Sequence, residues 1–172
     1  MELPAFLTAA FYKNHLVILP ENQAPVPENP KQIIEPVSEN VKTYLGDNKK
    51  KIVVLHKEPA AAYLTEEQFK LLSGILHACR LSMEDIAIFN LAHHSILFQQ
   101  LKLQLQPQFL ILFDVIPTAI ELPFTIPPYQ IQEYNNCKIL VAGSLQYMTL
   151  ESEEVKKEKT LLWNALRKMF SL

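Results

Sequence analysis

The side chains of this 172-residue chain that are best suited to chemistry stand just after predicted strands. They are His93, His94, Asp114 and Ser144, which follows Gly143. Enzymes built on a parallel sheet place their catalytic groups just beyond the carboxyl ends of the strands. A cleft at one edge of a sheet would be lined by His93, Asp114, Gly143 and Ser144. The turn of Ala142, Gly143 and Ser144 offers little chemistry, so the pattern indicates an enzyme-like fold with no visible active site.

The two histidines do not predict a metal site. Adjacent residues on a helix point about 100° apart, so two imidazoles in a row do not readily share an ion, and no third ligand is evident. We expect His93 and His94 at a helix start or in solvent, although either could line the cleft. Two cysteines alone make neither a disulfide framework nor a zinc site. Cys79 lies on an apolar helical stripe, which predicts a buried free thiol.

Asp114 and Ser144 each have two interpretations. Asp114 could serve as a catalytic carboxylate, but no partner base or nucleophile is evident, and we favour a side chain that caps the turn at Pro117. Ser144 follows Gly143 without the surrounding G-x-S-x-G pattern of a nucleophile elbow. Turn formation is therefore the favoured role for Ser144.

Short apolar runs predict the strands that position these side chains. The predicted strands are 52–55, 86–89, 109–113 and 139–141. Thr65 to Gln68 forms a capping box that starts a helix with an apolar face. A second helix is expected over 94–104, with Leu97, Phe98 and Leu101 inward, and Ser152 can cap a third. In the third helix Val155, Leu162, Leu166 and Met169 recur at helical spacing, and Trp163 is expected as a core or cleft-edge anchor.

The alternation of strands and helices favours an α/β fold, specifically a three-layer α/β/α domain with a mainly parallel sheet of four to five strands. We expect a single domain over residues 1–172. Its predicted parts are an N-terminal helix and strand (1–19), a proline-rich connection (20–36) and the core (51–172). The segment 114–137 breaks the pattern, with a helical turn at 117–121 and then an extended stretch able to pair at a sheet edge.

Composition narrows the function classes. Apolar residues make up 49% and charged residues 20% of the chain, as in ordinary globular proteins. A net charge of −2 gives no case for nucleic-acid binding. The three glycines are scattered, so no phosphate-cradling loop and no cofactor are predicted. No apolar run is long enough for a membrane span and no secretory pattern is seen, so we expect a cytoplasmic protein.

The apolar N-terminus is the best candidate for binding a partner. Its contact residues are predicted to be Leu3, Phe6, Leu7, Phe11 and Tyr12. One interpretation is that this segment docks on the chain's own sheet, and this is slightly favoured. The other is a helix that lays its aromatic side into a groove of a partner.

Residues 138–170, KILVAGSLQYMTLESEEVKKEKTLLWNALRKMF, resemble the end of the uracil-DNA glycosylase superfamily. Those proteins finish with a strand, a His-Pro-Ser type turn, a leucine-containing link and a basic helix with a tryptophan. Here Ala142, Gly143 and Ser144 stand where that turn would fall, so the histidine is absent. No Gly-Glu-Ala-Pro-Gly or Gly-Ile-Asn-Pro-Gly type motif lies upstream either. Both departures argue against glycosylase activity.

The whole layout is similar to the psi subunit of bacterial DNA polymerase III. LPAFLTAAFYKNHLVILPE, KIVVLHKEPAAAYLTEEQFKLLSGILHA and the C-terminal segment follow the order of that family. The resemblance implies a glycosylase-like fold without activity, in a subunit that links the clamp loader to other replication proteins through its N-terminal segment. Residues 117–130 have no counterpart in it. The alternative is a divergent nucleobase glycosylase or related hydrolase that uses Asp114 or His93.

Overall fold

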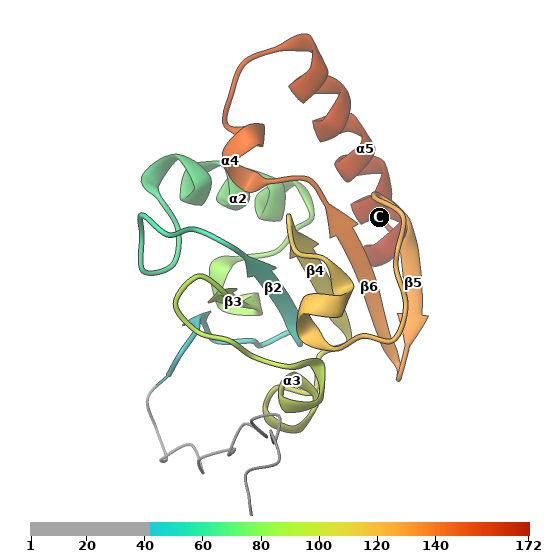
Figure 1. The fold of residues 1–172 in the computed structure, drawn as a ribbon. Coiled ribbons are helices and arrows are strands. Elements are labelled where there is room, and N and C mark those ends of the chain that lie inside the picture. The colour runs from blue at the N-terminus through green and yellow to red at the C-terminus, as the bar shows by residue number, and fades with distance from the viewer. Residues whose placement is uncertain (1–41) are drawn as a thin grey trace, which may run out of the picture. The chain divides into compact units, whose positions relative to one another are not determined.

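The computed structural model describes residues 42–172, which form a six-stranded sheet with helices packed on it (Figure 1). The strands are β1 (Leu45–Gly46), β2 (Ile52–His56), β3 (Ile86–Asn90), β4 (Phe109–Phe113), β5 (Ile131–Tyr134) and β6 (Cys137–Ala142). The α-helices are α2 (Glu66–Ala78), α3 (Phe98–Gln104), α4 (Leu145–Met148) and α5 (Glu153–Phe170). Short 3-10 helices cover Met83–Asp85 and Pro117–Ile120. The predicted α/β class is confirmed, and all four predicted strands are present.

The sheet is mixed. Its strand order is β1-β3-β2-β4-β6-β5, in which β3, β2, β4 and β6 run parallel while β1 and β5 pair antiparallel at the two edges. The expectation of a mainly parallel sheet of four to five strands is therefore wrong. The sequence pattern found the long apolar strands, which are covered on both faces. It gave β5, which carries polar residues, only as an extended stretch able to pair at an edge, and it did not predict the two-residue strand β1.

A two-residue hairpin joins β5 to β6. Asn135 and Asn136 connect Tyr134 to Cys137, and both asparagines have positive φ, at 53° and 56°. Two consecutive positive φ values are those of a type I′ turn, in which asparagine is favoured because its short side chain tolerates the left-handed region. So tight a turn can only reverse the chain, which makes β5 antiparallel to β6.

The alternation of side chains along the strands divides the core in two. Ile52 and Val54 point to one face, where they pack with residues of α2, α4 and α5. Val53 and Leu55 point to the other, where they pack with α3 and with residues 115–126. Each central strand is buried along nearly its whole length because both of its faces are covered.

Helix α2 begins as predicted and α3 does not. The Thr65 hydroxyl accepts a hydrogen bond from the Gln68 amide, and Gln68 Oε1 accepts one from the Thr65 amide, which completes the capping box. Helix α3 begins at Phe98 rather than His94. The prediction failed because the amides of His93 and His94 both turn back to the carbonyl of Asn90, and the chain is extended at Leu97 before the helix starts.

Helix α5 is confirmed, with the Ser152 hydroxyl accepting from the Val155 amide and with Val155, Leu162, Leu166 and Met169 buried. Trp163 is 36% exposed, so of its two expected places, the core and a cleft edge, the core is excluded. It lies about 100° around the helix from Leu162, at the margin of the buried stripe.

The predictions for the cysteines and for the segment after Pro117 are confirmed, whereas those for the N-terminal segment concern residues that the structure does not describe. Cys79 is a buried free thiol, as is Cys137. The predicted turn after Pro117 is a 3-10 helix, and the extended stretch that follows it pairs at the edge as β5. The predicted N-terminal helix and strand, together with the proline-rich connection, lie outside the described residues. Within residues 42–172 no helix is long and apolar enough to cross a membrane.

Candidate functional site

The predicted site residues separate into two places along one edge of the sheet. Strands β3, β2, β4 and β6 are parallel, so the residues that follow them share the same edge. Asp114 follows β4 and lies beside the turn after β6, since its amide donates to the carbonyl of Ala142 over 3.0 Å. His93 follows β3, and β2 stands between β3 and β4. The structure therefore brings Asp114 to Gly143 and does not bring His93 to either.

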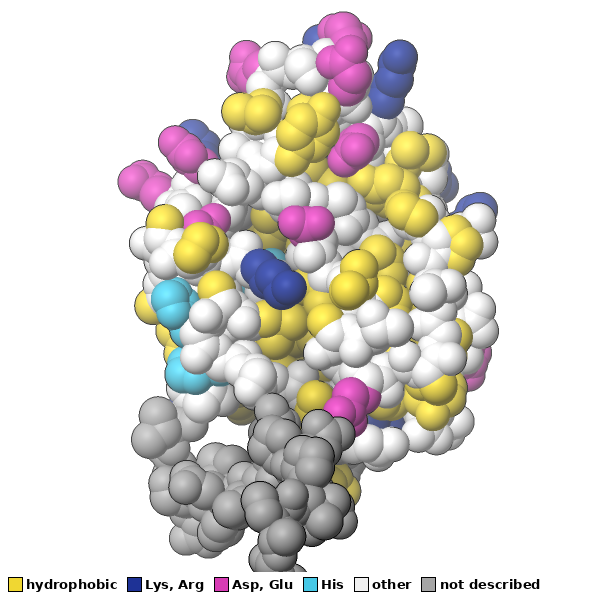
Figure 2. All heavy atoms as spheres, viewed as in Figure 1, with side chains coloured by type: hydrophobic (Ala, Val, Ile, Leu, Met, Phe, Trp, Pro, Cys, Tyr) yellow, Lys and Arg dark blue, Asp and Glu magenta, His cyan; other side chains and the backbone are white. Residues whose placement is uncertain are grey.

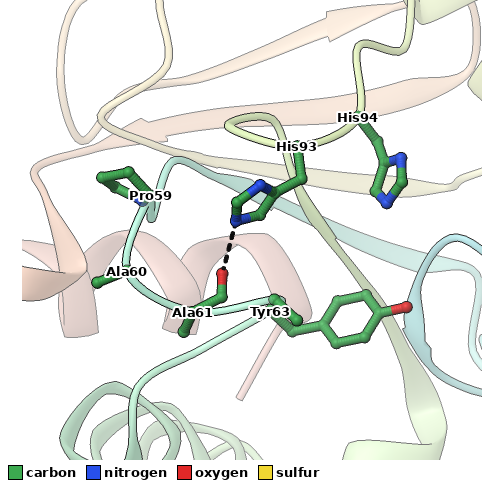
Figure 3. A pocket seen from close by; sticks show the side chains of 7 residues that line it. Pro59, Ala60, Ala61, Tyr63, His93 and His94 are labelled. Atoms are coloured by element: carbon green, nitrogen blue, oxygen red, sulfur yellow. Dashed lines mark hydrogen bonds between the residues drawn. The ribbon is translucent and has the colours of Figure 1, made fainter.

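A shallow pocket of about 380 Å³ lies between the loop after β2 and the loop after β3 (Figure 3). It is lined by Pro59, Ala60, Ala61, Ala62, Tyr63, His93 and His94. Both histidines are exposed, and histidine side chains reach the surface on this side of the molecule (Figure 2). His93 Nε2 lies 3.0 Å from the carbonyl oxygen of Ala61. Because that oxygen can only accept, Nε2 carries the proton, which leaves Nδ1 of the neutral ring as an acceptor.

Asn90 at the end of β3 holds the backbone of the loop after β2 in place. Its side-chain amide donates to the carbonyls of Glu58, Ala61 and Ala62 over 2.6, 2.8 and 3.2 Å. Its oxygen accepts from the amides of Glu58 and Ala92 over 2.9 and 3.0 Å. The side chain is 0% exposed. Asn90 therefore fixes the loops after β2 and β3 against each other and sets the shape of the pocket.

Glu58 and Gln68 extend this network to α2. One oxygen of the buried Glu58 carboxylate accepts from the Ala60 amide over 3.0 Å, and the other accepts from the Gln68 side chain over 2.5 Å. Gln68 also belongs to the capping box with Thr65. The start of α2 is thereby tied to the end of β2 through polar groups that are themselves buried.

His56 is the fourth buried polar residue and the least satisfied. It is the last residue of β2 and pairs in register with Asn90 of β3. Neither ring nitrogen of His56 has a hydrogen-bond partner within residues 42–172. Burial lowers the pKa of His56 to about 4, an effect that the nearby Glu58 carboxylate partly opposes. The imidazole is therefore neutral at physiological pH.

The turn after β6 is fastened by a tyrosine from the segment before β5. The Gly143 amide donates to Tyr129 Oη over 3.2 Å, and Tyr129 Oη donates to Glu158 Oε2 of α5 over 3.0 Å. The pKa of Tyr129 is raised to about 12, mainly by burial, with a smaller lowering by the Gly143 amide and a smaller raising by Glu158. A Cβ at position 143 would lie only 2.7 Å from Glu158 Oε2, so a larger residue there would displace the end of the Glu158 side chain.

Ser144 and Asp114 have local roles at the same edge. The Ser144 hydroxyl accepts from the Tyr147 amide over 3.4 Å and caps α4, which confirms its expected part in forming a turn. The expectation for Asp114 is wrong, because Ile116 is the N-cap of the turn at Pro117 and no side chain caps it. Asp114 is exposed, with a φ of 54°. No group of three or more His, Cys, Asp or Glu side chains suited to a metal occurs within residues 42–172.

Sequence reasoning missed the buried network of Glu58, Gln68 and Asn90 and the buried His56 next to it. Two of these residues carried a signal, since His56 and Asn90 are polar residues that directly follow strongly apolar runs. Gln68 was recognised only as part of a capping box. The predicted contact residues Leu3, Phe6, Leu7, Phe11 and Tyr12 lie outside the described residues.

No protein-family model matches this chain, and no curated protein is significantly similar to it.

Proposed function

We propose that this chain is a non-catalytic interaction subunit of the psi type, which links a clamp loader to other replication proteins. Leu3, Phe6, Leu7, Phe11 and Tyr12 are the contact residues in this proposal. The sheet with helices on both faces supports a three-layer α/β/α fold of the uracil-DNA glycosylase kind as its framework. So does the C-terminal order of β6, a small-residue turn, α4 and a helix with Trp163.

The observation that carries the proposal is the internal use of the polar groups at the turn after β6. The Gly143 amide is bound to Tyr129, Tyr129 is bound to Glu158, and Ser144 caps α4. In the enzymes that this segment resembles, that turn supplies a catalytic side chain. Here its hydrogen-bonding groups hold the segment before β5 and α5 against the sheet, which favours a structural role over a chemical one.

Co-purification tests the proposal. The tagged full chain is expressed in its native organism, and the recovered proteins are identified by mass spectrometry. We expect clamp-loader subunits with the unaltered chain and their loss in a Phe6→Ser, Phe11→Ser double variant. Leu103→Ser is the matched control, because Leu103 lies on α3 and is 82% exposed. Recovery without clamp-loader subunits from the unaltered chain would contradict the proposal.

The second candidate is a nucleobase glycosylase or related hydrolase. One observation favours it, namely that the exposed carboxylate residue Asp114 lies beside the turn after β6. Release of uracil from uracil-containing DNA by the purified chain would establish the activity, provided that Asp114→Asn abolishes it. Folding of the variant is checked by circular dichroism. Release that persists in the variant would show that Asp114 is not the catalytic group.

A further inference from the structure

The outer edge of β5 carries backbone groups that face away from the sheet. Within the described residues β5 pairs only with β6. In a two-residue hairpin the residues that flank the turn, here Tyr134 and Cys137, form a hydrogen-bonded pair. The pattern then alternates, so Gln132 also points its N–H and C=O groups toward β6. The N–H and C=O groups of Ile131 and Glu133 therefore point outward.

One side-chain contact agrees with this assignment. The Gln132 side-chain amide donates to the Glu133 carbonyl oxygen over 3.5 Å, which is long for a hydrogen bond. A contact of that length is weak and is readily exchanged for a better donor. The edge therefore offers main-chain donors and acceptors that an added strand would satisfy.

Helix α5 runs along the β6–β5 side of the sheet (Figure 1). The residues of α5 on the side nearer this edge include a stripe of exposed positions. Glu158 of α5 contacts Tyr129, two residues before β5, and Leu161 lies one turn further along on the same side. The stripe consists of Glu154, Lys157, Leu161, Asn164, Lys168 and Leu172. Leu161 is 50% exposed, and neither lysine forms an ion pair within residues 42–172.

The side chains of this stripe indicate which kind of partner segment would fit against it. Beside it, a shallow depression of about 520 Å³ is lined by Asn164, Arg167, Lys168 and Leu172. An apolar side chain fits against Leu161, and an acidic one fits against Lys157 or Lys168. A second copy of the chain fits poorly. Two-fold pairing through β5 would set the α5 stripes of both copies face to face and bring lysine against lysine.

We propose that the β5 edge and the α5 stripe together bind an extended segment of a partner protein as a seventh strand. On the side facing α5, that segment carries apolar and acidic side chains in alternation. This inference rests on the proposed function as an interaction subunit and places a second contact surface on the α/β domain. Because β5 is four residues long and carries Glu133, the edge is too short and too charged to pair with strands indiscriminately.

The test uses a synthetic peptide, acetyl-Val-Thr-Asp-Thr-Val-Thr-Asp-amide, titrated into the ¹⁵N-labelled full chain by NMR. Its Val and Asp side chains share one face of a strand. We expect a Kd on the order of 0.1–1 mM, as for a short peptide that adds one strand. The amides of Ile131 and Glu133 should become protected from exchange, while those of Gln132 and Tyr134, already paired with β6, should change little.

Four controls make the result specific. A peptide N-methylated at alternate residues loses its main-chain donors and should not bind. A peptide with Lys in place of Asp should bind at least about fivefold more weakly, as expected for like charges at a partly exposed site. Glu133→Pro removes one outward N–H, a change that an edge strand tolerates, and should weaken binding about tenfold. Leu103→Ser should leave binding unchanged, and circular dichroism establishes that both variants fold.

The proposal is overturned if the Val/Asp peptide does not bind the full chain, or if it binds Glu133→Pro as tightly as the unaltered chain. It is also overturned if sedimentation shows a dimer that Glu133→Pro disrupts, since a second copy would then occupy the edge. Clamp-loader association depends on Phe6 and Phe11 in the proposed function. If the unaltered chain recovers no clamp-loader subunits but still binds the peptide, the result counts against that function and not against this surface.

Discussion

Replacing Asn90 by alanine should destabilise the chain more than any surface substitution. The side chain is 0% exposed and joins three carbonyls and two amides of the loops after β2 and β3. The alanine variant leaves the N–H and C=O of Glu58, a buried residue, without partners. Leaving a buried polar group unpaired costs about 1–3 kcal/mol. The groups at Ala62 and Ala92 belong to exposed residues and can turn to water. We therefore expect a loss of about 2–4 kcal/mol.

Urea unfolding followed by far-UV circular dichroism measures this loss as a change in the free energy of unfolding. Hydrogen exchange adds a local readout, because the amide of Glu58 should lose its protection while that of Leu72 in α2 follows global stability. Asn90→Asp is the matched variant. It keeps the acceptor but replaces the donating amide by a carboxylate beside three carbonyl oxygens, so it should cost at least as much at pH 7.

A loss below about 0.5 kcal/mol for Asn90→Ala would refute the reasoning, since that is the range of surface substitutions away from special features. So would an Asn90→Asp variant as stable as the unaltered chain at pH 7. Either result would mean that the loop does not depend on these hydrogen bonds for its conformation.

Three further predictions follow from the same structure. Because burial lowers the folded pKa of His56 to about 4, stability should fall as the pH drops from about 6.5 toward 4, and His56→Leu should reduce this fall in urea titrations at several pH values. Gly143→Ala should cost about 1 kcal/mol in the unaltered chain and less in a Glu158→Ala background, as a double-mutant cycle would measure, because the new methyl group meets Glu158 Oε2. Cys137 is fully buried, which raises its pKa to about 12, so iodoacetamide at pH 8 should label it only in denaturant.

The sequence was most informative where one local rule decided the outcome. Strand β4 was predicted with its observed bounds because five apolar residues in a row fit only a strand covered on both faces. The start of α2 followed from the spacing of Thr65 and Gln68, which is a property of the chain alone. Strand β5 was seen only as an extended stretch, since its polar residues give no apolar pattern and its place depends on β6.

The candidate site was the least predictable part. Asp114, Gly143 and His93 all follow strands, and nothing in the sequence shows which of them lie next to each other. Strand order separates them, because β4 and β6 are neighbours while β3 lies beyond β2. The exposure of Trp163 on α5 could not be predicted from the sequence either. Helical spacing places this residue at the margin of the buried stripe, and only the neighbouring elements decide whether it is covered.

The sequence by itself determined the four parallel strands, the capped helices α2 and α5 and the α/β class, because these depend on residues close together along the chain. The tertiary structure decided which loops meet, and thereby created the network in which Asn90 reaches Glu58 across 32 positions. A buried amide hydrogen-bonds whichever carbonyl the fold brings within about 3 Å, and separation along the sequence does not limit that choice. The same holds for the turn after β6. Its polar groups were visible in the sequence, whereas their partners, Tyr129 and Glu158, are brought next to them only by the fold.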